Sequence, residues 1–87
     1  MPYIKKEKRE LFWRDSAIST LIQDVADCGG DLNYLFTCLI NEFIHKKGMS
    51  YATVNEVVGA LECCKLELYR RKIAPYEDLK IKENGDV

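Results

Sequence analysis

The sequence contains one long apolar run, Leu32-Asn33-Tyr34-Leu35-Phe36-Thr37-Cys38-Leu39-Ile40-Asn41-Glu42-Phe43-Ile44. As a helix, this run is apolar nearly all round, and a helix that is apolar on every face is buried on every face in a folded protein. A single small chain has too few other segments to enclose it, so we expect copies of the chain to associate. Asp31 precedes the run as a predicted N-cap, and His45-Lys46-Lys47-Gly48 ends it with cations and a glycine. We therefore predict a helix over residues 31–46.

A second helix is predicted before this run, over residues 5–27. Its apolar stripe repeats with a period near 3.6 residues and consists of Leu11, Ile18, Leu21, Ile22 and Val25. Cys28-Gly29-Gly30 is expected to end this helix, because glycine readily adopts the left-handed conformation found at helix ends. Trp13 lies off the stripe, so we expect it to face a partner surface or a groove.

A third helix is predicted over residues 51–73. It begins at Ser50 or at Thr53, because Thr53-Val54-Asn55-Glu56 has the pattern of a capping box. Two adjacent apolar stripes run along it, one with Val54, Val57, Val58, Leu61, Cys64 and Leu68, the other with Gly59, Cys63, Leu66, Tyr69 and Ile73. Ala74-Pro75 is expected to end the helix, since proline disfavours helical geometry in the residue before it. Pro75 then begins a short helix over residues 75–82.

Together these patterns predict an all-α fold, because no alternating run of useful length suggests a strand. The chain has 87 residues, which corresponds to one domain over residues 1–87. A chain this short buries only ~60% of its unfolded surface, so it is marginally stable alone. We expect three main helices and a short C-terminal helix in a helical bundle completed by oligomerisation. Asn84-Gly85 is a turn or a loose end, which leaves the order of residues 83–87 open.

Composition and charge exclude several classes of protein. The chain is 47% hydrophobic and 31% charged with a net charge of -1, which is typical of a soluble globular protein. No apolar run reaches the ~20 residues that span a bilayer. The basic N-terminus lacks the apolar segment of a signal peptide, so we expect a cytoplasmic protein. Between Asp15 and His45 there are five acidic residues and no Lys or Arg, which makes nucleic acid an unlikely partner.

The four cysteines and the single histidine suggest neither a metal site nor a disulfide. Cytoplasmic thiols stay reduced, and the adjacent Cys63 and Cys64 point about 100° apart on a helix. No pair has zinc-site spacing, and His45 has no Cys, Asp or Glu three or four residues beyond it. We expect Cys38, Cys63 and Cys64 to behave as small apolar core residues. No metal and no cofactor is predicted.

A basic and aromatic group near the end of the third helix is the main candidate ligand site. Guanidinium groups hold phosphate as a rigid fork, and tyrosine rings offer a flat face to a base. The residues are Tyr69, Arg70, Arg71, Tyr76 and Lys80. A structural role stays open, since cations also suit a helix C-terminus. Arg70-Arg71 can also pair with Glu77-Asp78 across the Pro75 corner.

A second candidate site lies at the start of the apolar helix. Asn33 and Tyr34 are predicted just inside its N-terminus, where free backbone amides attract anions. No catalytic arrangement accompanies either site, because the chain has one histidine at a helix end and neither a G-x-S-x-G nor an H-E-x-x-H motif. We therefore predict that the protein is not an enzyme.

Three parts of the sequence carry a family resemblance. They are the opening Met1-Pro2-Tyr3-Ile4, the corner Gly30-Asp31-Leu32-Asn33-Tyr34, and the tail, which consists of the segment from Leu68 to Asp78 and the final residues Glu83-Asn84-Gly85-Asp86-Val87. They resemble a family of small prokaryotic and phage proteins of unassigned function. In size and lack of catalytic motifs, the chain is also similar to small helical phage proteins that oligomerise and sequester nucleotide immune signals. That likeness implies a pocket between subunits lined by the basic and aromatic group.

Two functional hypotheses follow. The first is a non-catalytic helical oligomer that binds a small anionic ligand, a nucleotide-derived defence signal. The alternative is a protein-interaction or regulatory module that binds a protein partner through the Trp13 face. The first hypothesis requires Arg70 and Arg71 to be accessible, and the second predicts an exposed apolar patch around Trp13.

Overall fold

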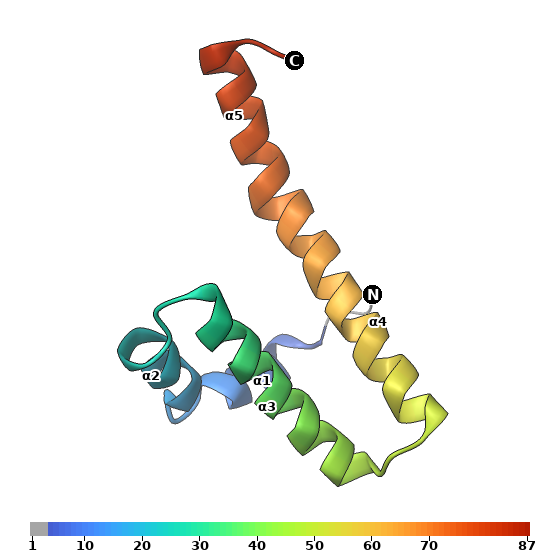
Figure 1. The fold of residues 1–87 in the computed structure, drawn as a ribbon. Coiled ribbons are helices and arrows are strands. Elements are labelled where there is room, and N and C mark those ends of the chain that lie inside the picture. Colours follow the sequence, from blue (N-terminus) through green and yellow to red (C-terminus); the bar gives the residue numbers. More distant parts are fainter. Residues whose placement is uncertain (1–3) are drawn as a thin grey trace. The chain divides into compact units, whose positions relative to one another are not determined.

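The computed structural model describes residues 4–87, and they form helices and connecting segments without a strand (Figure 1). The prediction of an all-α fold is thereby confirmed. The elements are α1 (Lys6–Trp13), α2 (Ala17–Asp24), α3 (Gly29–Lys47), α4 (Tyr51–Leu68), a π-helical turn η1 (Tyr69–Ile73) and α5 (Ala74–Asn84). The chain divides into two compact units, one ending at Met49 and the other spanning Ser50–Val87.

The predicted helix over residues 5–27 is wrong, because it is two helices with a break at Asp15 and Ser16. Ser16 has a left-handed backbone conformation (φ 62°, ψ 14°), which a continuous right-handed helix does not allow. The Asp15 carboxylate accepts a hydrogen bond from the Ala17 amide at 3.1 Å. A short acidic side chain that bonds its own backbone in this way competes with helix formation.

The start of α3 also differs from the prediction. Gly29 and Gly30 do not end the preceding helix but form the first turn of α3, and Cys28 is the N-cap. Asp31, predicted as the N-cap, lies three residues inside, and its Oδ2 accepts from the Asp27 amide at 2.9 Å. A carboxylate at this position reaches back to an amide just before the helix, as the acid of a capping box does.

The boundary between α3 and α4 agrees with the sequence patterns. Gly48 follows the last turn of α3 with φ 90°, and its amide donates to the Ile44 carbonyl at 2.7 Å. Ser50 caps α4, because its hydroxyl accepts from the Thr53 amide at 3.1 Å. Of the two predicted starts, Ser50 is therefore confirmed and Thr53 is wrong. Gly48 therefore ends α3, and Ser50 begins α4 as its N-cap.

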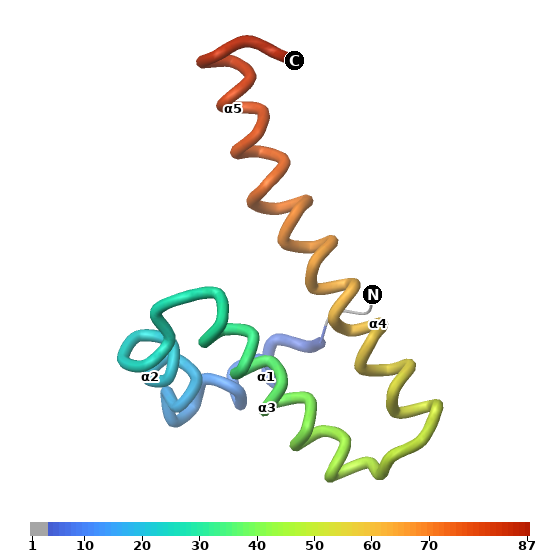
Figure 2. Tube along the Cα trace, in the orientation of Figure 1, coloured from blue at the N-terminus to red at the C-terminus, as the bar shows by residue number. Residues whose placement is uncertain are grey.

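The predicted end of the third helix at Ala74-Pro75 is wrong, and α4 continues through η1 into α5 as one long helix (Figures 1 and 2). Within η1 the Ala74 amide donates to the Tyr69 carbonyl, five residues back. This wider turn changes the local hydrogen-bond ladder just before Pro75, whose ring would otherwise meet the carbonyl of residue i−4. Ala74 keeps helical geometry, with φ -60° and ψ -47°.

Apolar side chains are exposed throughout residues 4–87. Thr53 is the one buried residue in that range, and no hydrophobic side chain there is buried. The cysteines predicted for the core are half-buried (Cys38 and Cys63) or exposed (Cys64). Helix α3, predicted to be buried on every face, exposes large apolar side chains such as Leu39. Covering this surface by copies of the chain stays a prediction.

Candidate functional site

The sequence-predicted site residues lie on two separate units. Tyr69, Arg70 and Arg71 form part of η1, and Tyr76 and Lys80 follow on α5. All five belong to the unit Ser50–Val87, and all five are exposed. The second predicted pair, Asn33 and Tyr34, lies on α3 in the other unit.

The basic and aromatic group is held by contacts along its own helix. Arg71 Nε lies 2.6 Å from Glu67 Oε2, one turn earlier on the same helix. The Lys80 ammonium lies 5.5 Å from the centre of the Tyr76 ring and 3.3 Å from Glu83 Oε2. Because the helix does not turn at Pro75, this group forms an open helical surface and not a corner.

Asn33 and Tyr34 do not offer free amides, and that part of the prediction is wrong. Helix α3 begins at Gly29, and the Leu32 amide already donates to the Cys28 carbonyl at 3.1 Å. Only the first four amides of a helix lack an intrahelical partner, so Asn33 lies beyond them. The Asn33 carbonyl accepts from the Thr37 hydroxyl at 3.0 Å, which is an ordinary helix-interior contact.

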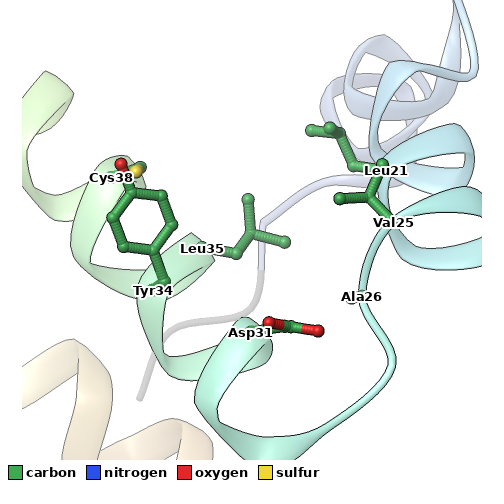
Figure 3. A pocket seen from close by; sticks show the side chains of 7 residues that line it. All are labelled: Leu21, Val25, Ala26, Asp31, Tyr34, Leu35 and Cys38. Carbon is green, nitrogen blue, oxygen red and sulfur yellow. The ribbon is translucent and has the colours of Figure 1, made fainter.

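A pocket of about 360 Å³ opens in the first unit, and sequence reasoning did not identify it. It is formed where α2 ends and α3 begins, and Figure 3 shows Leu21 and Val25 across from Leu35. The lining residues are Leu21, Val25, Ala26, Asp31, Tyr34, Leu35 and Cys38. Its signal in the sequence was the apolar stripe through Leu21 and Val25, whose partner helix could not be located by periodicity alone.

Two lining residues have shifted pKa values. The hydrogen bond from the Asp27 amide is the largest effect and lowers the pKa of Asp31; desolvation opposes it, and weaker hydrogen bonds with Cys28 lower the pKa further. The Tyr34 hydroxyl bonds to the Cys38 thiol, and this hydrogen bond and the charge of the thiolate raise the pKa of Tyr34. The pocket is therefore an apolar surface with an ionised carboxylate and a neutral phenol at neutral pH.

A family model described as a domain of unknown function, DUF6899, matches residues 1–87. The chain belongs to the DUF6899 family. No curated protein and no solved structure matches it.

Membership of DUF6899 agrees with the resemblance to a family of unassigned function. The phage origin and the sequestration of a nucleotide signal stay predictions. Residues 4–87 contain no cluster of three or more His, Cys, Asp or Glu side chains that could hold a metal ion. Within the same residues, no helix is long and apolar enough to cross a membrane.

Proposed function

We propose that this DUF6899 chain is a non-catalytic binding protein that assembles from copies of itself and holds a small anionic ligand in the assembled form. The observation that carries the assembly is the absence of any buried hydrophobic side chain within residues 4–87. Hydrophobic residues make up 47% of the sequence. Burial of apolar surface is the dominant favourable contribution to folding and to most protein association.

The exposed apolar surface is larger than single scattered residues would give. It includes large side chains on every helix, such as Phe12, Leu21, Leu39, Leu66 and Leu79. Extended exposed apolar surface is typical of a protein-interaction surface. A self-associating protein covers such a surface by packing one copy against another, and this needs no second kind of protein.

The anionic ligand is the second part of the proposal, and the basic and aromatic group supports it. The Lys80 ammonium lies 5.5 Å from the centre of the Tyr76 ring, and both residues are exposed, so a cation and an aromatic ring share one surface of α5. A phosphate bonds to the cations and a base stacks on a ring. A nucleotide-derived signal has both groups. The biological setting, phage counter-defence, rests on the resemblance drawn from the sequence.

A protein partner bound through the Trp13 face is the alternative function. Trp13 is 57% exposed, and Leu11 and Phe12 beside it on α1 are also exposed. Tryptophan and its apolar neighbours are typical anchors of protein interfaces. This surface favours a regulatory module whose target is another protein.

Light scattering over a concentration series, combined with thermal unfolding, tests the proposal. We expect an oligomer that dissociates on dilution, and a rise in melting temperature with one member of a panel of cyclic and ADP-ribose-type nucleotides. Tyr76→Ala and Lys80→Ala should remove that rise, while Lys46→Ala at the end of α3 should not. A monomer at all concentrations would contradict the assembly. An oligomer indifferent to every nucleotide would contradict the ligand and favour the Trp13 partner.

A further inference from the structure

We propose that the pocket formed by α2 and α3 is the docking site for a second copy of the chain. The long helix made of α4, η1 and α5, here called the C-terminal helix, inserts Leu66, Tyr69 and Ile73 into the pocket, and its Arg70 pairs with Asp31. This inference rests on the proposed self-assembly and names the surfaces that make it. Each of these two surfaces is incomplete alone, and each has what the other lacks.

The pocket presents an apolar wall and negative charge. Five of its lining residues are Leu21, Val25, Ala26, Leu35 and Cys38, all without a charge, and Asp31 supplies the one carboxylate of the lining. In Figure 3 the Asp31 carboxylate lies at one side of the opening beneath Leu35. A suitable occupant is therefore an apolar group next to a cation.

The acidic character extends beyond the lining. Asp24 and Asp27 flank Val25 and Ala26 in the sequence, and residues 15–45 contain no Lys or Arg to balance them. An acidic peptide or a free anion would be repelled by these carboxylates. A symmetric contact of this pocket with the same pocket of another copy would also place like charges together, which disfavours it.

The C-terminal helix presents the complementary face. Leu66, Tyr69, Arg70 and Ile73 are spaced i, i+3, i+4 and i+7, the spacing of one helical face that anchors in a groove. Leu66 is 57% exposed, Tyr69 49% and Ile73 37%. The π-helical turn keeps Tyr69 and Ile73 close in register, because about one turn of a wider helix separates them. Arg70 stands among these apolar side chains as the cation.

The charge of this segment is opposite to that of the pocket. Residues 65–72 contain the four bases Lys65, Arg70, Arg71 and Lys72 and the single acid Glu67. The segment therefore carries a net charge of +3 (four positive minus one negative). Opposite fields on two surfaces of one chain favour contact between the unlike surfaces of two copies, and they set its orientation. Tyr76 and Lys80, one to two turns further along, stay outside this contact and remain accessible to an anion.

The test uses two variants of the full chain, each defective in one of the two surfaces. Leu35→Glu places a second carboxylate in the pocket, and Ile73→Glu places one on the helix face. Each variant alone should lose self-association by about tenfold or more in dissociation constant, as expected at an anchor of an interface. An equimolar mixture should associate again, because one variant keeps an intact helix face and the other an intact pocket.

The control is Tyr51→Glu, a substitution at an 88% exposed aromatic residue outside both surfaces, which should leave assembly unchanged. Far-UV circular dichroism of each variant checks that it is folded, and Val25→Lys with Leu66→Asp forms a second pair if one of the first does not fold. Light scattering measures the oligomer size of the wild-type chain, of each variant and of the mixtures. A wild-type oligomer whose paired variants fail to associate would overturn this inference and leave the proposed function standing. A monomeric wild-type chain would overturn both.

Discussion

The Tyr34 hydroxyl bonds to the Cys38 thiol one turn later on α3, at the edge of the apolar pocket (Figure 3). The phenol donates its proton to the sulfur, and a phenolate would lose this bond and meet the charge of a thiolate. Both effects favour the neutral phenol, so the pKa of Tyr34 is raised above its ordinary value of 10.0. The contribution of this bond to stability is present below the ordinary value and is lost as the pH rises through the raised pKa.

Replacement of Cys38 should therefore lower the pKa of Tyr34. In Cys38→Ala the hydrogen bond and the thiolate are both gone, and one of the five tyrosines should ionise at lower pH than in the wild-type protein. Absorbance titration of the phenolates measures this shift, and Tyr34→Phe identifies which step belongs to Tyr34. Cys63→Ala on α4 is the matched control. An identical titration curve in Cys38→Ala would contradict the contact.

The Asp31 carboxylate should make α3 sensitive to acid. Its pKa is lowered from 3.8, so its contribution to stability is present above that value and is lost as the pH falls through the lowered pKa. Asp31→Asn should be less stable than the wild-type protein near neutral pH, and the difference should shrink in strong acid. Urea unfolding over a pH series measures this difference. Asp24→Asn serves as the control, and a difference independent of pH would argue against ionised Asp31 as the acceptor.

Gly48 and Gly59 should respond to alanine in opposite directions. Gly48 has φ 90° and ψ 147°, a conformation that a side chain disfavours, so Gly48→Ala should destabilise the protein by about 1–3 kcal/mol. Gly59 lies inside α4, and an added methyl group there meets nothing within 4 Å. Gly59→Ala should stabilise the helix by roughly 0.5–1 kcal/mol. Urea unfolding at one fixed protein concentration compares the two, and a change of the same sign would contradict the boundary after α3.

Pro75 should lower the free energy of unfolding by less than a proline inside a regular α-helix does. The π-helical turn before it adjusts the backbone, so Pro75→Ala should raise the free energy of unfolding by well under the roughly 3 kcal/mol typical of a helix interior. Leu79→Pro, one turn further along α5 and without such a turn before it, should cost about the full amount. Thermal unfolding followed by circular dichroism distinguishes them. If Pro75→Ala raised the free energy of unfolding by as much as Leu79→Pro lowers it, η1 would not reduce the cost of Pro75.

The helix signals that sequence patterns read correctly are the local ones. Gly48 as a stop and Ser50 as a cap each act through a bond to a residue three or four positions away. The break at Ser16 was missed because the apolar stripe continues in phase across it, while the left-handed backbone at that residue leaves no trace in periodicity. The helix end predicted at Pro75 is wrong because proline disfavours helical geometry in the residue before it without forbidding it, and Ala74 keeps that geometry.

The candidate sites also differ in how far local sequence predicts them. Sequence order brought Tyr69, Arg70 and Arg71 together, and one helical segment keeps them together. The pocket depends on Val25 of one segment lying across from Leu35 of another, which no period within a single helix specifies.

The amino-acid sequence by itself determined that the chain is all-α, where α3 ends, and that residues 15–45 carry acidic side chains but no Lys or Arg. These properties follow from side-chain pattern and from hydrogen bonds between near neighbours. The tertiary structure alone decided that α2 and α3 together line an open apolar pocket beside Asp31, and that one helix runs unbroken past Pro75. Both depend on backbone geometry, because a change of direction at Ser16 or a wider turn at Tyr69 reorients every side chain that follows.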